Sequence, residues 1–128
     1  MRVRIGRVIA AAVIAEILGV VILVCLVAMF GPSGGFQEAQ PFAEQLGAWV
    51  GPVSGFVLCA LGGWWVARVV PRRYKLINGF SMGLAGATLD LAIGATLGAG
   101  VAAILLFSNI GRVIGGGIGG WVASRQPE

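Results

Sequence analysis

The sequence contains no histidine, and only 11% of its 128 residues are charged, less than half of the usual share of about 25% in soluble domains. This scarcity of charge excludes a soluble globular domain and a disordered chain. There are only two cysteines and no Cys-x-x-Cys pair, which argues against a disulfide-stapled module and a metal site. No phosphate-binding glycine loop ends in lysine, and no nucleophile stands beside a base, so we expect neither an enzyme nor a cofactor.

Apolar residues and glycine fill the sequence instead: 58% of the residues are hydrophobic and 22 are glycine. A bilayer core needs about 20 mostly apolar residues per helix. Four stretches qualify, at residues 8–30, 47–70, 76–97 and 101–122. A break is placed at Gly98–Gly100 because one helix from 76 to 122 would be far longer than a bilayer is thick. The sequence predicts an all-α fold, a four-transmembrane-helix bundle in one integral membrane domain, with a solvated loop at residues 31–46.

The basic residues predict the orientation of these helices. Eight of the nine Lys and Arg residues flank the first span, the turn at Pro71 or the end of the last span. The other two connections contain none, so both termini and the Pro71 turn are expected in the cytoplasm. We therefore expect a multi-pass protein of the plasma (inner) membrane of a bacterium, with the lipid bilayer as its partner. The net charge of +4 then reflects topology and lipid contact, and no nucleic acid is needed.

The two halves of the chain share a pattern. Residues 62–68 read Gly-Gly-Trp-Trp-Val-Ala-Arg, and residues 119–125 read Gly-Gly-Trp-Val-Ala-Ser-Arg. The first and third spans each carry a single acid, Glu16 and Asp90, among small and aliphatic residues. The chain can be interpreted as two parallel helical-hairpin repeats related by an axis along the membrane normal. Coincidence is the alternative, since Gly, Trp and Arg are common at membrane boundaries.

Glycines at four-residue spacing let helix backbones approach closely in lipid. Such rows are Gly47, Gly51 and Gly55; Gly79 and Gly83; Gly86, Gly94 and Gly98; and Gly111, Gly115 and Gly119, with Gly116 and Gly120 beside the last. Packing within the bundle is the simplest interpretation. An oligomer seam or a solute path along bare backbone is the alternative. Because the rows outnumber what one bundle needs, we expect a homo-oligomer or a subunit of a larger membrane complex.

Three charges fall inside the spans: Glu16, Asp90 and Arg112. Each costs at least about 2.5–3.5 kcal/mol near the bilayer centre, so each should face protein or water. At 1.5 Å per residue they lie roughly 12, 21 and 15 Å from the cytoplasmic helix ends. We expect one guanidinium between two carboxylates, with Asn109 and Thr88 completing the hydrogen bonds. Alternatively, Arg112 reaches to the cytoplasmic surface and leaves the acids unpaired.

The expected cluster fits two functions. Two carboxylates that share one arginine are not both easily ionised in a low dielectric, so the pair is expected to share a proton. The sequence favours a non-enzymatic structural or accessory membrane component that packs through glycine-rich faces. The alternative is a small proton- or cation-coupled transporter or channel that uses Glu16 and Asp90. A wet cavity beside the cluster would favour transport, and a dry, fully paired cluster would favour the structural role.

Residues 62–125, about half of the chain, resemble small bacterial four-helix membrane proteins of uncharacterised families. The shared motifs are the Gly62–Arg68 turn, Asn78-Gly79, Asp90-Leu91, and the segment from Asn109 to Gly120. The resemblance implies a four-helix integral membrane fold and no particular activity. Separately, residues 15–19 (Ala-Glu-Ile-Leu-Gly) resemble the first-helix acid motif of small multidrug resistance transporters, whose buried Glu binds protons and cationic drugs. That family's third-helix Trp-Ser-Gly motif is absent from this sequence.

Overall fold

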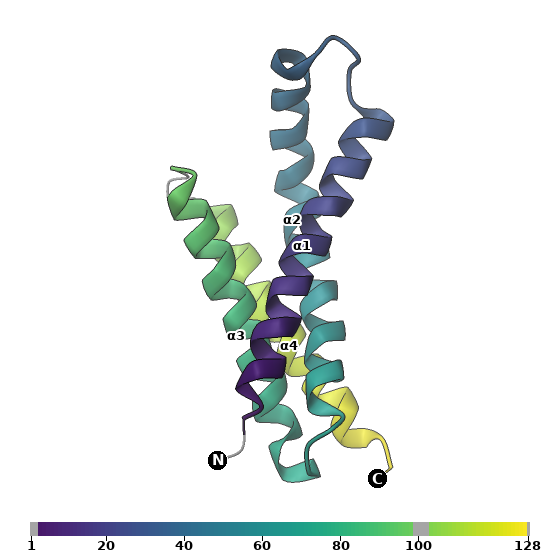
Figure 1. Cartoon of the computed structure of the whole chain (residues 1–128), viewed down its shortest axis with the longest axis vertical. Coiled ribbons are helices and arrows are strands. Elements are labelled where there is room, and N and C mark those ends of the chain that lie inside the picture. Colours follow the sequence, from purple (N-terminus) through teal and green to yellow (C-terminus); the bar gives the residue numbers. More distant parts are fainter. Residues whose placement is uncertain (1–2, 99–102, 128) are drawn as a thin grey trace.

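The computed structural model describes residues 3–98 and 103–127, and this part of the chain is all-helical. The four helices are α1 (Ile5–Phe30), α2 (Phe36–Ala67), α3 (Arg72–Thr96) and α4 (Ala103–Arg125) (Figure 1). Each is long and apolar enough to cross a membrane. The prediction of an all-α fold with four membrane-spanning helices is therefore confirmed.

The largest difference from the sequence-based expectation lies between the first two spans. Residues 36–46, expected as a solvated loop, are the first three turns of α2, and only residues 31–35 connect the helices. Glu38 in the first turn suits the positive end of the helix dipole, and Gln40 donates a hydrogen bond to Glu44 one turn later. These local interactions stabilise a helix that is too polar to be recognised as a membrane span.

The break between the third and fourth spans begins as expected. α3 ends at Thr96, and Gly98 has a φ of 73°, a left-handed conformation that glycine adopts at little cost. The rest of the expected break, Ala99 and Gly100, and the expected start of the fourth span at Val101 lie outside the described residues.

The helices meet at one end and diverge at the other. The first and last described residues and the connection between α2 and α3 lie together at the lower end of Figure 1. We call this the basic end, because it carries Arg4, Arg7, Arg68, Arg72, Arg73, Lys75 and Arg125. Away from it, the α1–α2 pair separates from the α3–α4 pair (Figure 1).

Glycine brings α4 into direct backbone contact with its neighbours. A Cβ atom at Gly116 would lie 2.6 Å from the backbone nitrogen of Gly83 on α3. A Cβ at Gly119 would lie 2.6 Å from the backbone nitrogen of Trp64 on α2. Since backbone atoms cannot turn aside as a side chain can, only glycine fits at these positions.

The other glycines of the expected rows have different surroundings. A Cβ at Gly115 would clash with the Phe56 backbone of α2, and one at Gly86 would lie 3.0 Å from Cys59 Sγ on the same helix. A Cβ at Gly47 would make only ordinary contact with Leu23, at 3.6 Å. Gly94 is half-buried. Gly51 and Gly111 have open space within 4 Å of the Cβ position, so these two do not pack against a helix of this chain as expected. Spacing alone placed them on glycine rows, but the neighbouring helices do not cover those points.

Burial differs sharply between the first and the last helix. In the apolar 18-residue segment of each helix, 6% of the residues are buried in α1 and 44% in α4. The buried residues of α1 are confined to its first half, from Val8 to Ala15. The apolar surroundings of Cys25 in the sequence suggest a buried thiol, but Cys25, farther along α1, is exposed. Cys59 on α2 is buried. α1 is thus the most exposed of the four helices and α4 the most buried.

The two acid-bearing helices lie side by side in register. The Arg4 backbone nitrogen on α1 donates a hydrogen bond of 3.0 Å to Asn78 Oδ1 on α3, across 74 positions in the sequence. Glu16 and Asp90 are separated by the same 74 positions and occupy the same level of the two helices. A two-fold axis along the membrane normal would relate α1 and α3 in this way.

The glycine-rich helices also end alike. The Arg68 guanidinium lies 5.1 Å from the ring centroid of Trp64 on α2, and that of Arg125 lies 4.7 Å from the centroid of Trp121 on α4. Each pair is a cation–π contact across one helical turn. These features fit the two-hairpin interpretation, while duplication itself stays a prediction.

Candidate functional site

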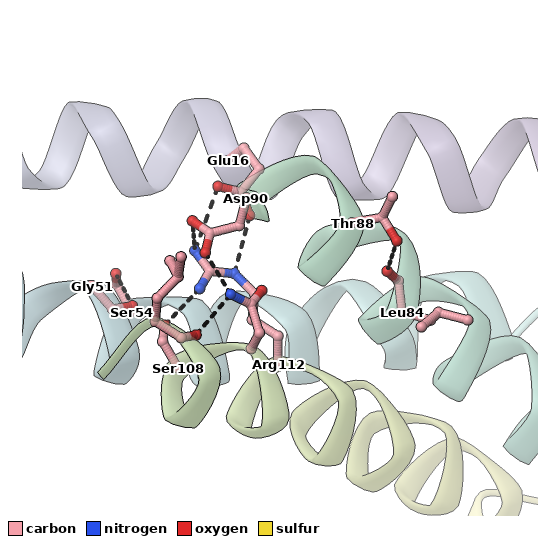
Figure 2. Close-up of polar contacts among 10 residues, drawn as sticks. Glu16, Gly51, Ser54, Leu84, Thr88, Asp90, Ser108 and Arg112 are labelled. Atoms are coloured by element: carbon pink, nitrogen blue, oxygen red, sulfur yellow. Dashed lines mark hydrogen bonds and ion pairs between the residues drawn. The ribbon is translucent and has the colours of Figure 1, made fainter. Parts of the chain in front are cut away.

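Arg112 joins three helices through one guanidinium group (Figure 2). Its Nε lies 3.1 Å from Glu16 Oε1 on α1, and its Nη2 lies 3.0 Å from Asp90 Oδ1 on α3. Its Nη1 donates a 2.7 Å hydrogen bond to Ser108 Oγ, one turn earlier on α4. The guanidinium is thus held between both carboxylates, as the sequence predicts, and does not reach the membrane surface.

The remaining helix, α2, supplies the space for the Arg112 guanidinium. A Cβ atom at Gly55 on α2 would lie 2.8 Å from Arg112 Cζ, so the guanidinium rests directly on the α2 backbone. When residues 62–68 are aligned with residues 119–125, Gly55 falls opposite Arg112. The second hairpin therefore carries the arginine, and the first hairpin carries the smallest residue at the matching position.

Asn109 supports only one of the two acids. Its Nδ2 donates to Asp90 Oδ2 at 2.9 Å and to the Leu105 carbonyl at 2.8 Å. Its Oδ1 is buried without a hydrogen-bond donor in the described part of the chain. Asp90 thus accepts from two side chains, whereas the only side chain that donates to Glu16 in the described structure is Arg112.

The structure brings together Glu16, Asp90, Asn109 and Arg112, all four residues expected in the cluster. Thr88 is separate, because its hydroxyl donates to the Leu84 carbonyl on its own helix (Figure 2). Ser108 was not predicted, although its spacing of four residues from Arg112 places both on one helix face.

A cavity of about 150 Å³ adjoins the cluster. Its polar wall consists of Glu16, Asp90, Arg112 and Ser54, and its other wall is formed by aliphatic side chains and glycines of α1 and α2. Such a volume holds several water molecules, and polar groups are present to bind them. The side chains of Asp90 and Glu16 are 21% and 14% exposed, against 8% for Arg112. The carboxylates therefore face the cavity, and the guanidinium lies behind them.

The charges of the cluster do not cancel. With both acids ionised, two carboxylates face one guanidinium, and the excess negative charge lies in a region where an unpaired charge is costly. The remaining basic side chains that the structure describes lie at the basic end. Within residues 3–98 and 103–127, no three His, Cys, Asp or Glu side chains are grouped in a way that could hold a metal ion. The arrangement suits the uptake of one positive charge, most simply a proton.

Gly55→Ala is expected to weaken the cluster, because its methyl group would displace a guanidinium held by three partners. We expect a loss of about 1–3 kcal/mol in the free energy of unfolding, typical of overpacking. Gly51→Ala, one turn away in open space, is the matched control and should leave stability unchanged or slightly raised. Unfolding in detergent by a denaturing surfactant measures both. Equal behaviour of the two variants would contradict the placement of Arg112 on Gly55.

Comparison with known proteins gives no match: no protein-family model fits the chain, and neither a curated protein nor a solved structure is significantly similar to it.

Proposed function

We propose that this protein is a small transporter or channel that moves protons or a small monovalent cation through the Glu16–Asp90–Arg112 cluster. The observation that carries the proposal is the cavity, because both carboxylates line it together. A cluster that served only to join helices would need no water-sized space beside its acids. This reverses the preference for a structural role that the sequence alone gives.

Within this proposal the two acids have different roles. Asp90 is stabilised as a carboxylate by both Arg112 and Asn109, whereas Glu16 depends on Arg112. Glu16 is therefore the group that we expect to take up and release the exchangeable proton. Arg112 lies between the two carboxylates and offsets one of their two negative charges, so the cluster has room for one further positive charge.

The proposal includes an orientation and an assembly. The positive-inside rule places the basic end, with both termini, in the cytoplasm of a bacterium, so that the helices diverge toward the outer side of the inner membrane. The open Gly111 and the largely unburied α1 favour association with a second copy or a larger membrane complex.

Proteoliposomes under an imposed proton gradient test this function. We expect the purified protein to dissipate the gradient, and Glu16→Gln and Asp90→Asn to abolish the flux while retaining wild-type unfolding and oligomer size. Glu44→Gln is the matched control, because Glu44 lies outside the cluster and is bonded to Gln40. Silence of the wild-type protein under both proton and cation gradients would contradict transport.

A structural or accessory role is the second candidate, and one observation favours it. Arg112 already binds Glu16, Asp90 and Ser108, so the guanidinium ties α1, α3 and α4 together without any solute. Under this alternative the wild-type protein is silent in the flux assay, and cluster variants change stability or partner binding only.

A further inference from the structure

A second cavity lies on the outside of the bundle, between the first half of α1 and the second half of α2. It has a volume of about 270 Å³ and is separate from the charged cluster. Ala11, Ala15 and Gly62 leave the space, and larger apolar side chains such as Leu18 and Leu61 form its sides. From Ala11 to Leu18 it extends about 10 Å along α1, at 1.5 Å per residue. It is an apolar groove that follows α1 for that length.

The groove ends in a basic side chain. Trp65 lines it at the basic end, and the Arg7 guanidinium lies 4.0 Å from the centroid of the Trp65 ring. Arg7 Nη2 donates to the Trp65 carbonyl at 3.4 Å, while its Nε is buried and has no acceptor in the part of the chain that the structure describes. The guanidinium is therefore fixed at the mouth of the groove, with hydrogen-bonding capacity left unused.

Among residues 3–98 and 103–127, no acid lies beside this charge. The acids that the structure describes are Glu16, Glu38, Glu44 and Asp90, and none of them lies at the basic end. An arginine and a tryptophan at a helix end occupy the depth of lipid headgroups. A negatively charged group at that depth, attached to a hydrocarbon chain, matches both parts of the groove.

We infer that the α1–α2 groove binds one anionic phospholipid, with an acyl chain between Ala11 and Leu18 and the phosphate on Arg7. A zwitterionic lipid fills the apolar groove equally well but does not compensate the positive charge. The site is independent of the proposed transport function. The groove and the cavity beside the cluster both involve α1 and α2, but they share no lining residue.

Fluorescence quenching tests this site. Trp49, Trp64 and Trp121 are replaced by phenylalanine so that Trp65 is the only tryptophan, and the protein is placed in phosphatidylcholine vesicles. A share of the lipid is then exchanged for phosphatidylglycerol or phosphatidylcholine with brominated acyl chains. We expect phosphatidylglycerol to associate about fivefold more strongly, the ratio that corresponds to about 1 kcal/mol per basic residue at an anionic surface.

Two variants separate this site from general attraction to the surface. Arg7→Gln should remove the preference, and Arg7→Lys should keep part of it while verifying that the fold tolerates change at this position. Arg73→Gln is the matched control, because Arg73 lies at the same end over Tyr74 and away from the groove. Equal quenching by both lipids, or an equal loss of the preference in Arg73→Gln and Arg7→Gln, would each overturn the inference.

Discussion

Arg112→Leu is expected to lower the free energy of unfolding by about 3–5 kcal/mol, the usual loss when one partner of a buried ion pair is removed. The variant leaves Glu16 and Asp90 without a counter charge, and it removes the donor that Ser108 accepts from. Because the carboxyl groups can escape this penalty by binding protons, the loss should shrink as the pH falls. Surfactant-induced unfolding at neutral and acidic pH measures it.

The control for this experiment removes all three charges. Glu16→Gln, Asp90→Asn and Arg112→Leu together leave no uncompensated charge, so we expect the triple variant to be more stable than Arg112→Leu alone. The free energy of unfolding of Arg112→Lys should lie between those of the triple variant and of Arg112→Leu. The lysine ammonium group keeps the charge but cannot reproduce the planar fork of hydrogen bonds. A triple variant no more stable than Arg112→Leu would show that the cluster is not held together by its charges.

Gly116→Ala is expected to cost about 3 kcal/mol or more, at or beyond the upper end of ordinary overpacking effects. The new methyl group would lie 2.6 Å from the Gly83 backbone nitrogen and 2.5 Å from the Gly79 carbonyl oxygen. Neither atom can move without shifting α3, and the opposite side of Gly116 is occupied by Gly63 of α2.

Gly111→Ala is the matched control on the same helix. Apart from the backbone of α4 next to Gly111, no atom lies within 4 Å of the added methyl group. Alanine also favours the helix over glycine by about 1 kcal/mol. We therefore expect the unfolding transition of Gly111→Ala to stay in place or move to higher surfactant concentration. If the two alanine variants lose equal stability, the close approach of α4 to α3 is not what stabilises the bundle.

The four spans and the cluster could be predicted because a bilayer permits few arrangements. A helix must be long enough to cross the membrane, and charges such as Glu16, Asp90 and Arg112 must find partners inside it. Helix rise predicts depths for Glu16 and Asp90 that differ by roughly 9 Å, within the reach of one arginine side chain, whereas in the structure both acids lie level on the same guanidinium.

The remainder depended on information that the sequence pattern does not hold. Residues 36–46 are helical with Glu38 in the first turn and a hydrogen bond from Gln40 to Glu44 rather than through hydrophobicity, so a search for apolar stretches ends too early. Four-residue spacing placed Gly51 and Gly111 on helix faces but could not show which faces have neighbours. The cavity beside the cluster is lined by residues of all four helices, an arrangement that no single span reveals.

The rise in burial from α1 to α4 has a consequence for how the chain is made. α1 leaves the ribosome before α4, so the most exposed of the four helices precedes the one that is most surrounded by protein. Until α4 is inserted, Glu16 and Asp90 lack Arg112, and the glycines of α2 and α3 that contact α4 lack its backbone. Synthesis of the 23 residues of α4 therefore completes both the charge balance and the packing in one step, and chains that stop before α4 should be recognised by membrane proteases as unfinished.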